Sequence, residues 1–354
     1  MFSNFSLKPK TLSIMPTFAC SAACTNCGTL SHPHEKNHIS LETIKSAIKQ
    51  ASNKKLNFGN VVFTGGEATL RWKDLLESIS YSVSLKLPTR LVTNAHWARN
   101  EQKAHEKLNE LIVAGLKEIN FSTGDEHVKF VPFENVILAT KLALEKGLIV
   151  AIMTELKNNR EISKESIFSH SLIKNLDQDH LKSLTIHESP WMPLSPSEVE
   201  QYPIDVACNN NNLSAKGGCD SLLQTFVIQA DGRIGACCGL GMRLVPELNV
   251  GRSEGDFFLE NSIKNAEIDF LKLWIHYKGP EKIIAWASEK NPEIKWENMY
   301  AHKCQACLRM YKDPIIREVI REHYEEMITE VTLTAFIDDV FLPNQIIKHI
   351  PMVP

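Results

Sequence analysis

Three cysteines near the start of the chain have the spacing of a metal or cluster site. They are Cys20, Cys24 and Cys27. Thiolates grouped in this way suit a soft metal ion or an iron–sulfur cluster. Three thiolates offer a four-iron cluster one ligand too few, which would leave one iron open. The alternative is a zinc site whose fourth ligand is His32, His34 or His38.

The remaining cysteines all lie after residue 200. They are Cys208, Cys219, Cys237, Cys238, Cys304 and Cys307. An odd total of nine in a reducing compartment points to metal ligation or thiol chemistry rather than to a disulfide framework. The last two form a CxxC pair, a spacing that is also common in zinc sites.

The overall composition narrows the class of protein. With 354 residues, 43% of them hydrophobic and 23% charged, the chain is long enough for about two domains and is neither disordered nor fibrous. A net charge of −3 excludes the broad basic surface of a nucleic-acid-binding protein. Apolar runs stay below the roughly 18 residues of a membrane span, and residues 1–10 lack the apolar core of a signal peptide. We therefore expect a cytoplasmic protein with neither a nucleic acid nor a membrane as its partner.

Between the two groups of cysteines, short apolar segments alternate with amphipathic ones. Strands are expected at residues 11–18, 60–64, 90–94, 118–122, 148–155 and 183–186. Helices are expected after Ser40, over 73–85, 101–114 and 134–146, and in segments between 164 and 176. Six βα units in about 190 residues fall short of the roughly 250 residues of a closed eightfold barrel. The pattern therefore predicts an α/β fold with a parallel sheet in an open, partial (β/α)6 barrel.

A second, smaller unit is expected after the barrel. Four prolines between residues 190 and 203 and a run of asparagines at 209–212 place the boundary near residue 200. Segments 222–229 and 233–237 flank an Asp-Gly turn and predict a β-hairpin. The predicted division is a barrel at 1–200, a small α+β domain at 201–312, and a helix from 313 to 329 with a tail that ends at 354.

Two motifs at expected strand ends resemble those of the radical S-adenosylmethionine (radical SAM) superfamily. Cys20, Cys24 and Cys27 match its CxxxCxxC loop after the first strand, and Gly65-Gly66-Glu67 matches its GGE motif after the second. The resemblance implies a 4Fe–4S cluster whose open iron binds the methionyl group of SAM. A reductant such as flavodoxin or ferredoxin would supply the electron that cleaves SAM to methionine and a 5′-deoxyadenosyl radical. This radical would abstract a hydrogen atom from the substrate, so the protein would orient the reactants and exclude water.

The resemblance also suggests which residues contact SAM and the substrate. Candidates for SAM binding follow later strands: Thr93, Asn94, Ser122 and Glu155. The alternative is that they cap strands or lie in solvated turns. Asn26 departs from the family pattern, in which an aromatic residue near the adenine precedes the third cysteine. Asp125, Glu126 and His127 follow the fourth strand and are candidates for substrate contact or for a surface loop, and Trp191 is a candidate for a pocket wall or for core packing.

The later cysteines resemble the auxiliary cluster module called twitch, a short relative of the SPASM domain. Its pattern is a cysteine, a hairpin with an Asp-Gly turn, a cysteine and a distant CxxC, which here selects Cys219, Cys237, Cys304 and Cys307. Four thiolates would bind a complete 4Fe–4S cluster suited to electron transfer, or a structural zinc.

Two cysteines remain outside this selection. Cys208 is a further candidate ligand, and Cys238 could replace Cys237 or belong with Cys208 to a two-cluster SPASM set. Cys238 is also a candidate catalytic residue, because a thiol that returns a hydrogen atom to a substrate radical would produce an epimer.

The resemblance leaves several functions open. We expect a radical SAM enzyme that crosslinks, dehydrogenates or epimerises a ribosomally made peptide. A barrel that begins near residue 11 leaves no room for a preceding leader-binding domain, which weighs against a peptide. The alternatives are dehydrogenation or epimerisation of a small molecule such as a sugar or aminocyclitol, and a non-catalytic metal-binding protein. Glu67 and its two glycines disfavour the last, because in the family they bind SAM rather than metal.

Overall fold

The computed structural model describes residues 8–195, 202–203 and 205–341. Within these residues the chain forms one nine-stranded sheet in the order β6-β5-β4-β3-β2-β1-β7-β8-β9. The strands are β1 (Thr11–Ile14), β2 (Asn60–Phe63), β3 (Thr89–Thr93), β4 (Glu118–Ser122), β5 (Ile149–Leu156), β6 (Leu184–Pro190), β7 (Thr225–Ile228), β8 (Arg233–Gly235) and β9 (Asn249–Arg252). Strands β1 to β7 are parallel to their neighbours, and β8 and β9 extend the sheet antiparallel. The predicted open, partial barrel is confirmed.

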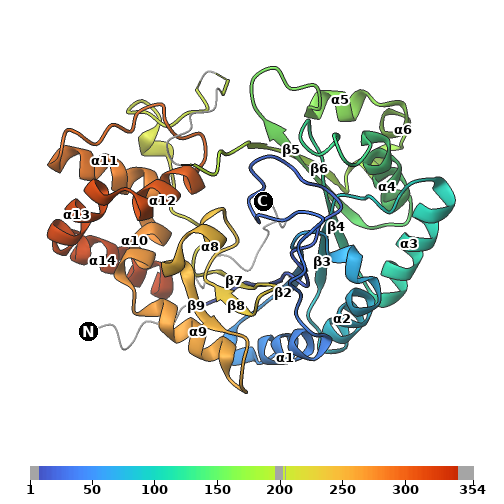
Figure 1. Ribbon diagram of the computed structural model, residues 1–354, viewed down its shortest axis with the longest axis horizontal. Coiled ribbons are helices and arrows are strands. Elements are labelled where there is room, and N and C mark those ends of the chain that lie inside the picture. The colour runs from blue at the N-terminus through green and yellow to red at the C-terminus, as the bar shows by residue number, and fades with distance from the viewer. Residues whose placement is uncertain (1–7, 196–201, 204, 342–354) are drawn as a thin grey trace.

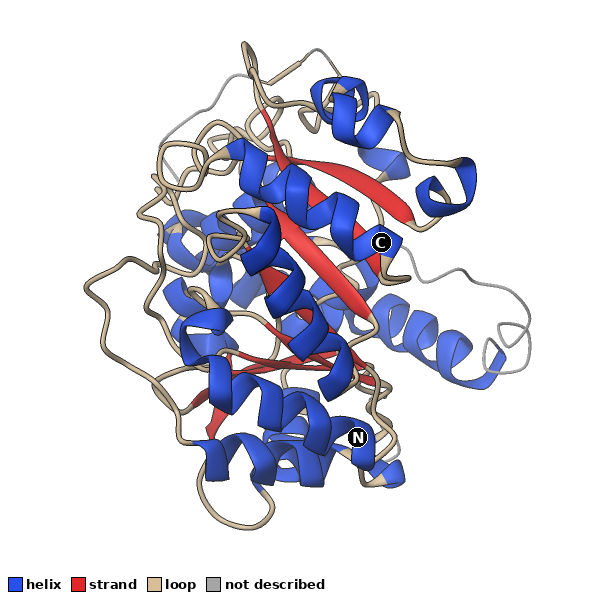
Figure 2. Ribbon diagram, turned by 90° about the vertical axis from the view of Figure 1, so that its right-hand side faces the viewer, coloured by secondary structure: helices blue, strands red, loops and turns tan. Residues whose placement is uncertain are grey.

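Helices cover the outer face of the curved parallel sheet (Figures 1 and 2). They are α1 (Leu41–Ala51), α2 (Trp72–Ser84), α3 (Glu101–Ala114), α4 (Phe133–Glu145), α5 (Lys164–Ser169), α6 (Ser171–Lys174) and α7 (Gln178–Leu181). The expected cap of α1 is present: the Ser40 hydroxyl accepts a hydrogen bond from Thr43 N at 3.2 Å. The apolar face of this helix, which consists of Ile44, Ala47, Ile48 and Ala51, is buried.

Side chains alternate along each strand between the hydrophobic core on the outer face of the sheet and the interior of the barrel. In β1, Leu12 and Ile14 are fully buried members of the hydrophobic core. Thr11 and Ser13, at the intervening positions, line a cavity inside the barrel. Because successive side chains of a strand point to opposite faces, the parallel sheet has a packed outer face and a mixed polar and apolar inner face.

The second unit shares the sheet with the barrel. Strand β7 pairs with β1, with Thr225 opposite Thr11, so the two units have a common backbone. Beyond the sheet lie α8 (Gly241–Leu244), α9 (Phe258–Glu267), α10 (Phe270–Lys278), α11 (Pro280–Lys290), α12 (Lys303–Lys312), α13 (Pro314–His323) and α14 (Glu325–Phe341). The predicted boundary near residue 200 lies outside the described residues. The described part of the chain contains no helix that is both long and apolar enough to span a membrane.

Several predicted elements differ in length from those observed. The first strand ends at Ile14 instead of residue 18, because Pro16 lacks the N–H needed to continue the ladder. The helix expected over 313–329 is two helices, α13 and α14, which meet at Tyr324.

Candidate radical SAM and thiol sites

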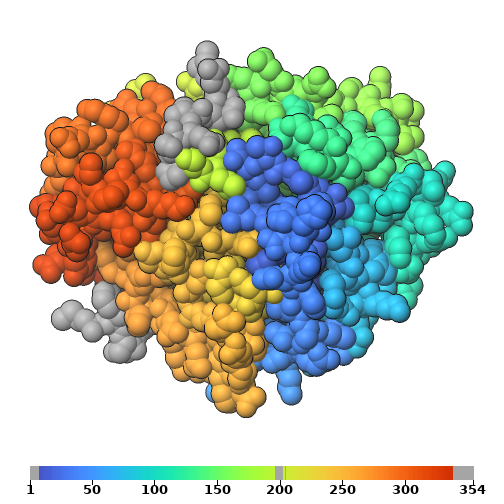
Figure 3. Space-filling view, in the orientation of Figure 1, coloured from blue at the N-terminus to red at the C-terminus, as the bar shows by residue number. Residues whose placement is uncertain are grey.

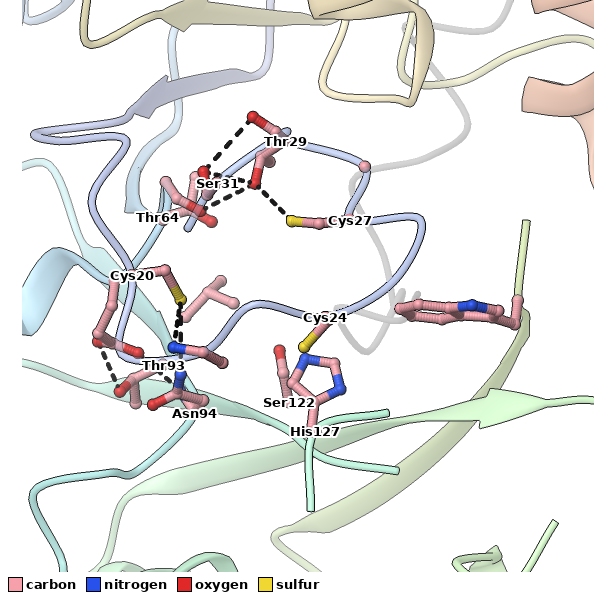
Figure 4. Close-up of a pocket in the computed structure, with 17 residues that line it drawn as sticks. Cys20, Cys24, Cys27, Thr29, Ser31, Thr64, Thr93, Asn94, Ser122 and His127 are labelled. Carbon is pink, nitrogen blue, oxygen red and sulfur yellow. Dashed lines mark hydrogen bonds between the residues drawn. The ribbon is translucent and has the colours of Figure 1, made fainter. Parts of the chain in front are cut away.

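The CxxxCxxC loop connects β1 to α1 and places its three thiols around one cavity. This cluster cavity has a volume of about 230 Å³, and Cys20, Cys24 and Cys27 all line it (Figure 4). Its wall also contains the predicted residues Gly65, Gly66, Glu67, Thr93, Asn94 and Ser122, together with His127 and Trp191. The histidines of the zinc alternative, His32, His34 and His38, are absent from this lining. A soft, three-thiol donor set beside open volume fits a 4Fe–4S cluster with one iron left for SAM.

The cluster thiols are held in a desolvated environment. Burial raises the pKa of Cys20 to about 11. Burial, with the neighbouring Cys27 and Cys20 as smaller causes, raises the pKa of Cys24 to about 12. Both thiols are therefore protonated near neutral pH when no metal is present, and binding of iron would release their protons.

The two glycines of the GGE motif allow the second strand to pack directly against the cysteine loop. A Cβ at Gly66 would overlap the carbonyl oxygen of Ala19 and lie 2.5 Å from that of Phe18. Gly65 has a φ of +124°, where a Cβ would lie 2.7 Å from the oxygen of Thr17. The backbones are joined by hydrogen bonds from Gly66 N to Thr17 O at 3.0 Å and from Glu67 N to Ala19 O at 2.8 Å.

Glu67 connects the loop to the end of β3. Its buried carboxylate accepts hydrogen bonds from Thr69 N at 3.2 Å, from the Thr93 hydroxyl at 2.9 Å and from Asn94 N at 2.8 Å. The Asn94 side chain in turn donates to Ser21 Oγ at 3.0 Å and lies 3.8 Å from Cys20 Sγ. Thr93 and Asn94 therefore belong to the scaffold around the first cysteine.

A second cavity of about 160 Å³ adjoins the cluster cavity and contains Asn26. The two cavities share Ser122, His127 and Trp191, and Glu155 lines the second one. Asn26 Oδ1 accepts a hydrogen bond from Leu194 N at 3.3 Å, which ties the segment after β6 to the cysteine loop. In that segment the Trp191 ring packs edge-on against His127, with centroids 6.3 Å apart. An aromatic ring is thus present beside the loop although position 26 is not aromatic.

The structure does not bring Asp125 or Glu126 to these cavities. The carboxylate of Asp125 accepts hydrogen bonds from Glu161 N and Ile162 N at 3.1 and 3.0 Å, which fixes a neighbouring loop. Glu126 pairs with Lys129 at 2.8 Å and Lys157 at 3.4 Å. Burial would raise the pKa of Glu126, but the two lysines outweigh it and hold that pKa below its usual range. These contacts fit the alternative of a structured loop.

Glu155 supports this loop from β5. It is almost fully buried, its carboxylate accepts a hydrogen bond from Glu126 N at 2.9 Å, and it lies 3.3 Å from His127 Nδ1. Gly124, with a φ of +135°, leaves the space that this carboxylate fills, because a Cβ there would lie 2.7 Å from it. Glu155 therefore orients His127, which does line the cluster cavity.

Four of the later cysteines surround a small apolar cavity of about 30 Å³, which we call the four-thiol site. They are Cys219, Cys237, Cys304 and Cys307, the set that the twitch pattern selects. Burial raises the pKa of all four, to about 12 for Cys304. The described residues contain no group of His, Cys, Asp and Glu side chains arranged around a single ion. Four desolvated thiols around one cavity, with Lys303 also in its lining, match the donor set of a four-iron cluster.

The other two cysteines lie elsewhere. Cys208 is buried and is bracketed by backbone hydrogen bonds, from its own N to Tyr300 O at 2.6 Å and from Asn298 N to its O at 2.8 Å. Cys238 is exposed, and its Sγ lies 3.1 Å from the Ser221 hydroxyl. Neither is in the lining of the four-thiol site.

Cys238 instead lines a third cavity, of about 610 Å³, inside the barrel. This barrel cavity is lined by residues of β1, β2, β3, β5 and β7, and it shares Thr29, Thr64 and Val92 with the cluster cavity. Its apolar wall includes Met15 and Met242. No local pattern marks Thr29 or Met242 as a cavity residue, because their positions depend on how the loop and α8 fold back over the sheet.

Comparison with known proteins agrees with these motifs. A family model of the radical SAM superfamily matches residues 14–159. The "Putative peptide biosynthesis protein YydG" of Bacillus subtilis (strain 168) is 26% identical over 128 residues, which cover 36% of this chain and 40% of that relative. The aligned part therefore spans less than half of the relative.

Two solved structures have the same fold over most of the chain. Native anSMEcpe with bound AdoMet superposes with a TM-score of 0.56 at 16% identity, covering 93% of this chain and 100% of that one. The same protein with AdoMet and the Cp18Cys peptide gives 0.53 at 17% identity, covering 93% and 99%. At these identities the likeness establishes the fold. The CxxxCxxC loop and the GGE turn lie within the matched residues, so residues 14–159 of the chain form a radical SAM domain, whose family uses a 4Fe–4S cluster and S-adenosylmethionine.

Proposed function

We propose that this enzyme inverts a carbon stereocentre in a peptide, and that the thiol of Cys238 returns the hydrogen atom to the substrate. The observation that carries the proposal is the barrel cavity, which has the cluster loop at one end and an exposed thiol elsewhere on its wall. Thr29 and Thr64 of its lining also line the cluster cavity, and Cys238 is the cysteine in its lining.

Strand directions place these two features at opposite ends of the barrel. The cysteine loop follows the carboxyl end of β1. Cys238 follows β8, which is antiparallel to β7, and the hydrogen bond from Leu223 N to Ala236 O at 2.8 Å sets this segment beside the amino end of β7. A strand of four residues is about 13 Å long at roughly 3.3 Å per residue. A substrate carbon between them would meet the two groups on opposite faces.

Inversion of a stereocentre requires that the hydrogen atom is removed from one face of the carbon and that another is donated to the opposite face. When bound at the reduced cluster, SAM supplies a 5′-deoxyadenosyl radical, which takes a hydrogen atom from the substrate. The Cys238 thiol then donates its hydrogen atom to the substrate carbon from the other face, so one S–H bond breaks and one C–H bond forms. The sulfur is left one electron and one proton short, and a one-electron reductant with a proton from water restores the thiol.

A peptide substrate is supported by the relatives and by the shape of the cavity. YydG carries a peptide biosynthesis name, and one anSMEcpe structure contains a bound peptide. The barrel cavity includes the exposed charged residues Lys10 and Asp220 in its lining, and its inner wall contributes apolar and hydroxyl groups. Such a wall suits a side chain and an adjoining backbone rather than a densely hydroxylated sugar.

A second candidate is oxidation of the same kind of substrate to a crosslink or a double bond. The four-thiol site favours this alternative, because a cluster bound there could accept the electron of a substrate radical. The two reactions differ in hydrogen balance. Epimerisation replaces a substrate hydrogen with one from an exchangeable thiol, whereas oxidation removes hydrogens from the substrate.

The test is a reaction in D₂O with reconstituted enzyme, SAM, dithionite and a mixture of short synthetic peptides that together present all twenty amino acids. We expect a peptide that gains one deuterium and yields the D-isomer on hydrolysis. Cys238→Ser should abolish this product while 5′-deoxyadenosine is still released, and the control Cys208→Ala should retain it. A wild-type product that lacks two hydrogens would favour oxidation, and a deuterated D-isomer from Cys238→Ser would exclude this thiol as the donor.

A further inference from the structure

One arginine of the second unit reaches across to the cluster loop. Arg243 lies on α8, and its Nη1 donates hydrogen bonds to the carbonyl oxygens of Thr29 at 2.5 Å and Leu30 at 3.2 Å. In the sequence, Arg243 is 214 positions from Thr29 and 213 from Leu30. In Figure 3 the blue segment that contains the loop lies against the yellow segment that contains α8.

The carbonyls that Arg243 binds belong to the turn that follows the third cysteine. Leu30 has a left-handed φ of +52°, which is unfavourable for a residue with a side chain, and its N donates to Cys27 O at 2.8 Å. The Thr29 hydroxyl lies 3.3 Å from Cys27 Sγ. Two charge-assisted hydrogen bonds to this turn therefore restrain the segment that places the Cys27 sulfur.

The guanidinium is held in place by an aromatic ring of the same loop. Its Cζ lies 3.6 Å from the centroid of the Phe18 ring, and Phe18 is fully buried two residues before Cys20. A planar guanidinium can stack flat on an aromatic face while its N–H groups donate hydrogen bonds in the plane, a combination that a lysine ammonium cannot reproduce. Arg243 thus contacts the loop on both sides of the CxxxCxxC motif.

The charge of Arg243 lies near one of the cluster thiols, that of Cys27. Burial lowers the pKa of Arg243, while Glu35 and Asp231 oppose this, and the group stays protonated at neutral pH. The acidic side chains facing it are thus those of Glu35 and Asp231, and Arg233 is the neighbouring cation. A fixed positive charge beside a thiolate-bound cluster favours its reduced, more negative state.

We propose that Arg243 is a positioning residue of the radical SAM centre: it fixes the turn after Cys27 from the second unit and its charge eases reduction of the cluster. This role concerns the shared radical SAM chemistry and does not depend on the peptide or on Cys238. It gives the second unit a direct function at the first cysteine site.

The experiment compares wild type with Arg243→Gln, Arg243→Lys and the control Arg252→Gln in the reconstituted holoenzyme. Arg252 lies on β9 of the same unit, is largely exposed and pairs with Glu254. An EPR-monitored redox titration gives the midpoint potential of the cluster whose signal changes on addition of SAM. A chelator challenge gives the rate at which that same signal is lost, and the SAM-insensitive signal serves as a measure of intact fold.

The two contributions of Arg243 predict different results for the two variants. Arg243→Gln should lower the midpoint potential and speed loss of the SAM-sensitive cluster by about tenfold, the effect of roughly 1.4 kcal/mol. Arg243→Lys keeps the charge but loses the stacked, two-carbonyl geometry, so its potential should stay near wild type while cluster loss is faster. The proposal is overturned if both variants match Arg252→Gln in potential and in loss rate. If Arg243→Gln does not fold, Arg243→Lys decides the positioning role by its loss rate alone.

Discussion

The contact between Gly66 and the cysteine loop gives a quantitative prediction for Gly66→Ala. The new methyl group would meet three backbone atoms, the oxygens of Ala19 and Phe18 and the Ala19 carbonyl carbon, and none of these can rotate away as a side chain could. Overpacking costs about 1–3 kcal/mol, and shifting the loop weakens two backbone hydrogen bonds of about 1 kcal/mol each. We expect a loss of roughly 3–5 kcal/mol, a large part of a typical stability of about 5–15 kcal/mol.

The assay is urea unfolding of anaerobically purified protein, followed by circular dichroism, together with SAM binding and iron content. Gly217→Ala is the matched control, because a Cβ there has no atom within 4 Å and its φ is not left-handed. The control should change stability by less than about 1 kcal/mol. If Gly66→Ala and Gly217→Ala unfold at the same urea concentration and bind SAM equally, the glycine is not needed for loop packing.

Three further results are expected. The lowered pKa of Glu126 means that its ion pairs stabilise the fold above its unfolded pKa of about 4.3, and this contribution disappears as the pH falls through the lower folded pKa. Glu126→Gln should therefore reduce the urea midpoint at neutral pH and have a smaller effect at acid pH. The control Glu293→Gln, at an exposed position after α11, should leave the midpoint unchanged at both, and an undiminished effect of Glu126→Gln at acid pH would contradict this reasoning. Trp191→Ala should weaken SAM binding about tenfold, measured by calorimetry, because the Trp191 ring lines both cavities. Trp191→Phe should weaken it much less, because an aromatic ring is kept. If Trp191→Ala binds SAM as tightly as wild type, Trp191 does not belong to the site. Reconstituted wild type should contain about eight irons per chain, and the triple Cys20→Ala, Cys24→Ala, Cys27→Ala variant about four. If the triple variant contains zinc instead of these four irons, the four-thiol site is structural.

The radical SAM half of the molecule could be predicted because local pattern and spacing determine it. Parallel strands bring their carboxyl ends to one edge, so Thr93, Asn94 and Ser122 necessarily approach the loop that follows β1. The same reasoning also favoured Asp125 and Glu126, which follow β4 closely. It could not foresee that Gly124, at φ +135°, turns the next residues toward the backbone of residues 161 and 162.

The helical part of the second unit could not be predicted from its periodicity. Lys272 of α10 and Glu281 of α11 are both about 96–97% buried, so charged residues occupy positions that an amphipathic pattern assigns to apolar ones. Pro280, at the start of α11, follows α10 so closely that the two helices give no clear gap. The contact of Arg243 with the cluster loop could not be predicted either. No local sequence pattern marks Arg243 or its partner Thr29, and the pairing of β7 with β1 brings the two segments together.

The tandem Cys237-Cys238 shows how one strand end can serve two sites. The chain bends directly after β8, and the side chains of Cys237 and Cys238 line different cavities. Cys237 is buried with the three other thiols of the four-thiol site, and Cys238 faces the barrel cavity. A cluster bound by Cys237 would therefore lie one residue from the thiol that we propose as the hydrogen donor. In the epimerisation that we propose, a cluster at the four-thiol site would be placed to supply the electron that restores Cys238 after each turnover. That task differs from oxidation of the substrate, and the hydrogen balance of the product distinguishes the two.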